Sequence, residues 1–228
     1  MRSVLATAVL LAGVAESEPL LWDFEKAPLD APPPGFTVAS TLGSPELVAK
    51  AAKWLVVEDA SAPSGKRILK LAETANRDEI MNLLLRDEAA PVDLCLSVRL
   101  RADAGEEDRG GGLVWRAIDA QNYYVTRWNP LENNLRIYRC VKGRRVQLQS
   151  VPIKADDKSW HTLEVTMRGR VIDVAFDGTK VASCADTHFP AAGKIGLWTR
   201  SNARSSFDDL SVNTAPEEPK SRQTPAAR

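Results

Sequence analysis

Several short segments of the chain alternate apolar and polar residues at every second position. In DLCLSVRLRA, the side chains of Leu94, Leu96, Val98 and Leu100 fall on one side, and polar or small residues separate them. The stretch WHTLEVTMRG (160–169) repeats the pattern. A period of two sends successive side chains to opposite faces of a strand. These segments are therefore predicted to be half-buried β-strands.

Turn signals separate the alternating segments. The segment VIDVAFDG ends in Asp177-Gly178, a strong hairpin turn, and TKVASCA follows as the return strand. The segments 193–200 and 207–212 add further short strands. Segments 45–54 and 77–88 have helix-forming composition, and 45–54 is a candidate short surface helix. Many short strands bounded by turns predict an all-β fold, a two-sheet antiparallel sandwich.

The two ends of the chain differ from this pattern. Arg2 precedes an apolar run from Val4 to Val14, and small residues around position 17 suit cleavage before Glu18, so residues 1–17 are predicted to be a signal peptide. A buried N-terminal helix is the alternative. Residues 214–228 are rich in proline and charge and are predicted to be disordered. The sandwich domain then spans 18–213. We expect a secreted or periplasmic protein without membrane insertion.

Charge and cysteine content narrow the classes of function. The chain has 30 basic and 30 acidic residues, a net charge of +0, which argues against nucleic acid as a partner. Export permits disulfides. Cys95, Cys140 and Cys184 allow at most one bridge, with three possible pairings, and no C-x-x-C occurs. We expect buried structural cysteines and no catalytic thiol.

An ordered series of segments carries a resemblance to a known family. They are WDFE (22–25), SAPSGKRILKL (61–71), the long stretch 110–145, SWHTLEV (159–165), VAFDGTKV (174–181) and the stretch 191–212. Together they resemble concanavalin A-like (laminin G-like) jelly-roll domains of exported bacterial proteins. Within that class they look most similar to the 3-keto-disaccharide hydrolase, or family sixteen glycoside hydrolase-like, group. The resemblance implies a jelly roll; it does not by itself imply one function, because this fold hosts lectins, hydrolases and adhesion modules.

The resemblance also implies that the first and last strands pair near a sheet edge. Asp23, Asp208 and Asp209 would then lie near one another. They are weak candidates for a calcium site; the favoured interpretation is that they accept hydrogen bonds from backbone or arginine donors, because no Asp-rich calcium loop is present. We therefore expect no cofactor, with calcium left open.

Candidate catalytic residues are few. Retaining hydrolases of this jelly-roll class carry Glu-x-Asp-x-Glu on a strand, which aims three carboxylates into one groove, and this sequence has no such motif. Of two histidines, His161 is interpreted as structural. His188, with Asp186 two residues before it, is the weak candidate for a general base.

Aromatic and basic residues are dense between positions 115 and 200. Strand alternation predicts that one outer sheet face gathers rings and guanidinium groups, with Trp128 and Trp198 as exposed platforms. Such a face suits a sugar, whose C–H face packs on a ring while its hydroxyls accept hydrogen bonds. The predicted ligand-binding residues are Trp115, Tyr124, Arg127, Trp128, Arg136, Tyr138, Trp198 and Arg200. The alternative is a solvated sheet whose cross-strand aromatic and arginine pairs only stabilise it.

Three hypotheses follow from the sequence. The first is an exported module that binds a carbohydrate on a concave aromatic and arginine face. The second is an enzyme, a hydrolase or lyase acting on 3-keto-glycosides. The sequence alone does not decide whether the chain is an enzyme. The third is an adhesion or assembly module without a small-molecule ligand.

Overall fold

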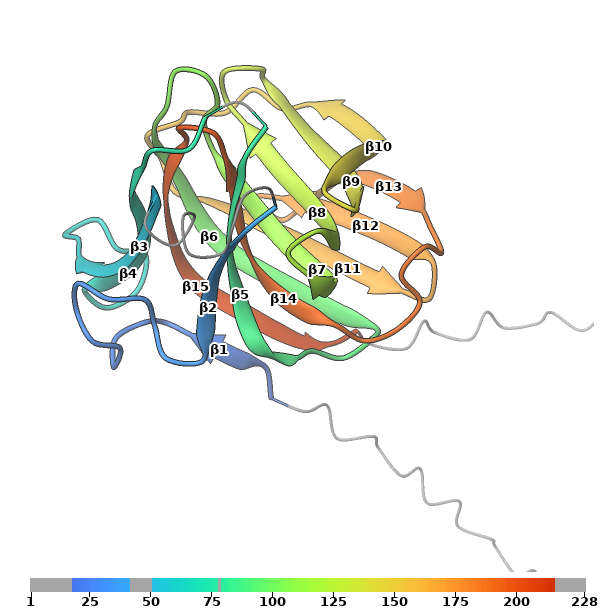
Figure 1. The fold of residues 1–228 in the computed structure, drawn as a ribbon, viewed down its shortest axis with the longest axis horizontal. Coiled ribbons are helices and arrows are strands. Elements are labelled where there is room, and N and C mark those ends of the chain that lie inside the picture. Colours follow the sequence, from blue (N-terminus) through green and yellow to red (C-terminus); the bar gives the residue numbers. More distant parts are fainter. Residues whose placement is uncertain (1–17, 42–50, 78, 216–228) are drawn as a thin grey trace, which may run out of the picture.

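The structure is a computed structural model that describes residues 18–41, 51–77 and 79–215. Within these residues every long element is a β-strand, and the strands form two antiparallel sheets packed face to face (Figure 1). This is the predicted all-β, two-sheet jelly-roll sandwich.

The larger sheet has eight strands. Its order is β13 (Thr179–Ala185), β12 (Val171–Phe176), β11 (His161–Arg168), β6 (Leu94–Ala104), β15 (Arg204–Thr214), β4 (Arg67–Thr74) and β3 (Ala52–Glu58), and β1 (Leu20–Trp22) also pairs with β15. Trp22 of β1 lies opposite Leu210 of β15. The expected pairing of the first and last strands is thus confirmed.

The second sheet has seven strands. Its order is β10 (Arg144–Pro152), β9 (Asn134–Val141), β8 (Asn122–Asn129), β7 (Gly111–Asp119), β14 (Lys194–Arg200), β5 (Met81–Ala89) and β2 (Phe36–Ser40). At the β7–β8 pairing the backbones approach closely, because a Cβ at Gly112 would lie 1.9 Å from the carbonyl oxygen of Thr126. Glycine is therefore required at this position.

The main core lies between the sheets. The alternating leucines and valine of β6 are fully buried there, as the sequence pattern predicts. Segment 81–89 is strand β5, and its apolar run is continuous because Leu83 faces one side of the sheet and Leu84 the other, both buried. In the candidate helix 45–54, residues 45–50 lie outside the described residues, and Trp54 belongs to strand β3 rather than to a helix.

The three cysteines form no disulfide with one another in the structure. Cys140 is buried, and Cys95 and Cys184 are half-buried. Burial raises the pKa of each thiol, that of Cys184 to about 11, so little reactive thiolate forms at neutral pH. No helix among the described residues is long and apolar enough to span a membrane.

A second buried cluster covers the outer side of the seven-stranded sheet. It contains Met81, Leu83 and Leu85 of β5 together with Tyr123, Tyr138 and Trp198 from the central strands. An apolar layer on the outer face of a sheet needs a cover, and arginine side chains provide part of it here.

Candidate functional site

Four arginines and two aromatic rings meet on the outer side of the seven-stranded sheet. We call this surface the arginine face and define it as Arg127, Arg136, Arg145, Arg200, Tyr138 and Trp198. The two rings form its floor: Trp198 is 1% exposed and Tyr138 is 6% exposed. The guanidinium carbon of Arg145 lies 4.9 Å from the centroid of Tyr138 and 5.7 Å from that of Trp198. Arginine and ring therefore stabilise each other by cation–π contact.

One carboxylate joins the two arginines on the β14 side of this face. Oε1 of Glu79 lies 2.6 Å from Arg200, and its Oε2 lies 3.6 Å from Arg145. Glu79 is largely exposed, whereas the side chain of Arg145 is mostly buried, and this burial lowers the pKa of the Arg145 guanidinium, with a contribution from the nearby Arg200. The face thus holds two cations close together at its centre.

A second carboxylate joins the other two arginines. Oε2 of Glu132 accepts from Arg127 at 2.9 Å and pairs with Arg136 at 3.0 Å, and Asn134 also donates to it at 3.0 Å. Burial raises the pKa of Glu132, but the hydrogen bonds from Asn134 and Arg127 outweigh it and hold the pKa at about 2. Arg136 also donates to the Tyr138 hydroxyl at 3.4 Å, which ties this pair to the aromatic floor.

A third carboxylate, Asp108, lies buried at the edge of the face. It accepts from Asn129 at 2.8 Å and from Arg200 at 3.2 Å. Burial raises the pKa of Asp108, while Arg127 and Arg200 oppose that rise. Two neighbouring carboxyl groups, Asp108 and Glu132, therefore have pKa values shifted in opposite directions.

Three of the predicted ligand-binding residues lie elsewhere. Trp115, Tyr124 and Trp128 are completely buried between the sheets, so the prediction that they lie on the outer face is wrong. On β8 the outward residues are Tyr123, Val125 and Arg127, one position away from those expected. Trp198 does lie on the outer side, but it is covered and is not the exposed platform predicted.

Tyr124 and Asp186 form a structural contact rather than part of a catalytic site. The Tyr124 hydroxyl donates to Asp186 at 2.6 Å, and Asp186 also accepts from Arg139 and from the backbone of His188. The pKa of Asp186 is lowered: burial raises it, but the hydrogen bonds from Tyr124 and from the His188 backbone have the greater effect. A carboxylate with these three donors already bound is poorly placed to act as a base.

The histidines have structural contacts in the described residues. The ring of His188 packs edge-on against Phe189 at 4.7 Å and is exposed, and only its backbone contacts Asp186. His161 begins β11, where its ring bonds Asp177 at 2.8 Å and the carbonyl of Asp156 at 2.7 Å. A His188–Asp186 dyad is therefore not formed.

The three aspartates considered for calcium are engaged by the chain itself. Asp208 accepts from the backbone of Ser64 at 3.2 Å and Asp209 from its hydroxyl at 2.7 Å, while Asp23 accepts from the Glu25 backbone at 3.1 Å. Burial raises the pKa of Asp208 to about 6. The described part of the chain contains no group of three or more potential ligands arranged to hold a metal.

Sequence reasoning missed Arg145 and the three carboxylates. Arg145 follows the Lys142-Gly143 turn and pairs with Cys140, so the hairpin register places it on the outer side. That turn was readable from the sequence and identifies Arg145 once the register is known. Glu79, Asp108 and Glu132 lie outside the strands, where no period indicates which way a side chain points.

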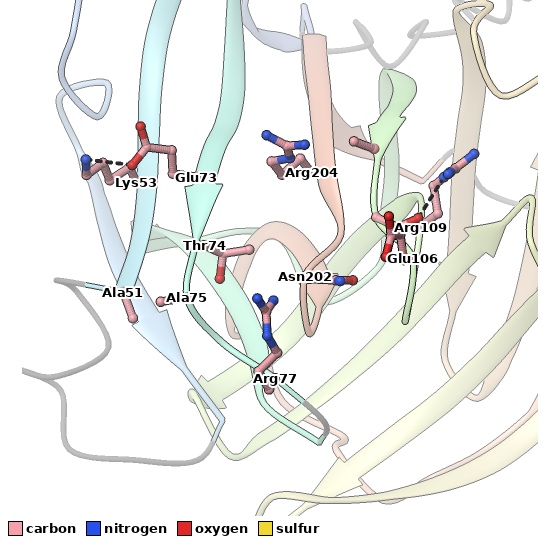
Figure 2. Close-up of a pocket in the computed structure, with 12 residues that line it drawn as sticks. Ala51, Lys53, Glu73, Thr74, Ala75, Arg77, Glu106, Arg109, Asn202 and Arg204 are labelled. Atoms are coloured by element: carbon pink, nitrogen blue, oxygen red, sulfur yellow. Dashed lines mark hydrogen bonds and ion pairs between the residues drawn. The ribbon is translucent and has the colours of Figure 1, made fainter.

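A polar pocket opens at one end of the sandwich. We call it the rim pocket; its volume is about 620 Å³. Figure 2 shows Lys53 and Glu73 on one side of it, Glu106 and Arg109 on the other, and Arg77, Asn202 and Arg204 in the middle. It is lined by Ala51, Lys53, Glu73, Thr74, Ala75, Arg77, Ala104, Gly105, Glu106, Arg109, Asn202 and Arg204. The loop that carries Gly105 and Arg109 also carries Asp108, so the rim pocket adjoins the arginine face.

The fold places the chain among the concanavalin A-like and galectin-like jelly-roll sandwiches. The carbohydrate-binding module CBM66 from Bacillus subtilis superimposes with a TM-score of 0.60 and 14% identity, covering 78% of this chain and 95% of that one. A β-glucanase from Bacillus licheniformis superimposes with a TM-score of 0.56 and 11% identity, covering 86% and 98%. A native glycosidic hydrolase gives 0.55 and 14%, covering 88% and 97%.

No protein-family model and no curated protein matches this sequence. At these levels of identity the structural similarities establish the fold, and function has to be argued from the site.

Proposed function

We propose that this chain is an exported carbohydrate-binding module and that the arginine face is its ligand-binding surface. The observation that carries the proposal is the arrangement of four guanidinium groups and three carboxylates around an aromatic floor on the outer side of one sheet. Sugar hydroxyls both donate and accept hydrogen bonds, and guanidinium and carboxylate groups supply the two complementary partners.

The arginine face is held in place before any ligand arrives. Glu132 and Glu79 each hold a pair of arginines, and the floor beneath Arg145 is rigid sheet. Side chains already ordered lose little conformational entropy on binding, which favours affinity. Arg136 and Arg200 keep 31% and 21% of their side-chain surface exposed, so their outer N–H groups remain available to a ligand.

The names of the similar structures are consistent with this proposal. One is a carbohydrate-binding module and two are named as carbohydrate hydrolases. The same fold therefore accommodates sugar ligands in other proteins. That similarity supports a carbohydrate as the class of ligand. The position of the ligand on the arginine face is our proposal.

A glycan array tests the proposal directly. We expect the wild-type domain to retain one or more glycans and Arg145→Gln to lose that retention. Arg144→Gln is the matched control, because Arg144 is the preceding residue of the same strand and its exposed side chain projects from the opposite side of β10. Equal retention by wild type and Arg145→Gln would overturn the assignment.

A second candidate function is an enzyme acting on 3-keto-glycosides. One observation favours it: burial raises the pKa of Asp108, which lies at the edge of the same surface, as a general acid requires. Scoring the same glycans and 3-keto-glycosides for turnover tests it. Cleavage abolished in Asp108→Asn would establish this function, and absence of turnover in the wild type would remove it.

A further inference from the structure

The rim pocket carries more positive than negative charge. The described residues that line it include four cationic side chains, Lys53, Arg77, Arg109 and Arg204, and two carboxylates, Glu73 and Glu106. No aromatic residue is among these described lining residues. A pocket of this composition has different ligand chemistry from the arginine face, where rings form the floor.

Two of the four cations are already paired. Lys53 binds Glu73 at 2.7 Å. Arg109 binds Asp157 at 2.5 Å and donates to the carbonyl of Gly105 at 3.1 Å. These two side chains form walls of the pocket, and part of their hydrogen-bonding capacity is already used within the chain.

The other two cations keep their hydrogen-bonding capacity. Among the described residues the side chain of Arg77 makes only long contacts, 3.8 Å to Glu107 and 3.4 Å to the carbonyl of Asn76, and it is 56% exposed. Arg204 begins β15 opposite Ala104, and its exposed side chain makes no hydrogen bond or ion pair to the residues that the structure describes. Its charge acts on Glu73 across the pocket, where it adds to the larger effect of Lys53 in lowering the pKa of that carboxyl.

A neutral donor lies between these cations. Oδ1 of Asn202 accepts from the backbone of Glu107 at 3.1 Å and of Asp108 at 3.3 Å. These two bonds fix the orientation of the amide, so its Nδ2 group is left to donate to a ligand. Figure 2 shows Asn202 between Arg77 and Arg204.

We propose that the rim pocket binds the anionic group of an acidic sugar, a carboxylate or a sulfate ester, through Arg77 and Arg204, with Asn202 as a third donor. The inference that an anion binds is argued from the charges described above. The inference that the anion belongs to a sugar rests on the proposed function. Guanidinium groups bind such oxyanions with paired, charge-assisted hydrogen bonds.

The size and walls of the pocket suit one terminal sugar. Its volume of about 620 Å³ lies within the range of roughly 300–1,000 Å³ that is typical of small-ligand sites. Small residues keep it hollow: Ala51, Ala75 and Ala104 line it. At Gly105, with φ +136°, a Cβ would lie 1.9 Å from the carbonyl oxygen of Asp108. The wall therefore depends on glycine at that position.

Isothermal titration calorimetry with the full chain tests this inference. The probes are a galacturonic acid trisaccharide, its methyl ester, a sulfated galactose trisaccharide, the neutral galactose trisaccharide and free sodium sulfate. We expect at least one acidic sugar to bind, and the uncharged probes to bind at least about tenfold more weakly because charge-assisted bonds are lost. Arg77→Gln and Arg204→Gln should each reduce affinity for the acidic sugar by about tenfold, and Arg144→Gln should not.

The outcomes separate this inference from the proposed function. Preference for the uronate or for the sulfated sugar identifies the anionic group, and either supports the pocket. Arg204-dependent binding of free sulfate without any glycan binding supports the anion site and overturns the carbohydrate function. Equal affinity for the uronate and its methyl ester overturns the inference, as does unchanged affinity in both arginine variants. The ester comparison uses wild-type protein and so does not depend on any variant folding.

Discussion

At the scale of single residues, Asp208 shows how burial changes the pKa of a carboxyl group. Asp208 is fully buried beside Asp209, and burial raises its pKa to about 6. An unfolded aspartate titrates near pH 4. Between about pH 4 and 6 the folded state therefore binds more protons at this position than the unfolded state, so the stability of the fold decreases as pH rises through that window.

Replacing Asp208 should remove this pH dependence. Between pH 4.5 and pH 7.5, wild type should lose about 1–2 kcal/mol of unfolding free energy relative to Asp208→Asn. Urea unfolding at the two pH values measures the difference. Asp30→Asn, at an exposed position, should follow the wild type. Identical pH dependence in Asp208→Asn and wild type would show that Asp208 does not carry the effect.

Two tyrosines provide a test of which rings are structural. Tyr124→Phe removes the hydroxyl that binds Asp186 at 2.6 Å, so it should cost about 1–3 kcal/mol of unfolding free energy while glycan retention persists. Tyr138→Phe removes only a 3.4 Å contact to Arg136, so stability should change little and glycan binding should weaken. Thermal unfolding and the glycan array measure both quantities. Loss of glycan retention in Tyr124→Phe, with retention unchanged in Tyr138→Phe, would contradict the position of the ligand on the arginine face.

At the scale of elements, strand β8 shows what sequence alone can and cannot predict. Its sequence correctly indicates a strand, but each of its faces mixes aromatic and polar residues, so composition does not say which face is inside. A shift of one residue exchanges the faces. Tyr124 and Trp128, which the sequence pattern predicts on the outer face, therefore fill the core instead. On β9, Leu135 and Ile137 contrast with Arg136 and Tyr138, and there the predicted faces are correct.

The fold was predictable where alternation is strong and turns are marked in the sequence. Strands such as β6 alternate strongly, and Asp177-Gly178 marks a hairpin whose turn has φ +49° and +74° at its two residues. The site was only half predictable. Glu79, Asp108 and Glu132 reach the arginine face from connecting segments, and their position depends on how the strands are ordered, which no local pattern reveals.

Close strand contact at Gly112 gives a prediction at this scale. Gly112→Ala should cost about 3 kcal/mol, because its Cβ would collide with the carbonyl of Thr126 at 1.9 Å and the β7–β8 ladder would have to separate. Gly169→Ala is the control: it has open space and φ +52°, so only the backbone conformation resists, at a cost of about 1 kcal/mol. Denaturant unfolding compares the two. Equal costs would contradict the close packing.

At the scale of the whole molecule, we propose that the chain is exported as a β-sandwich that carries two adjoining polar sites, the arginine face and the rim pocket. Residues 1–17 lie outside the described residues, so cleavage before Glu18 stays a prediction from sequence. Mass spectrometry of protein collected from the periplasm or medium should find Glu18 as the first residue. Protein that retains Met1 and stays in the cytoplasm would contradict export without affecting the binding proposal.

The central claim is that a glycan contacts the outer N–H groups of the arginine face. Two-dimensional NMR of arginine Nε–H signals, recorded while adding the best glycan from the array, tests it most directly. The account predicts that the signals of Arg136, Arg145 and Arg200 shift in a saturable way while that of Arg144 does not. Shifts confined to Arg144 and other arginines away from this face would contradict it.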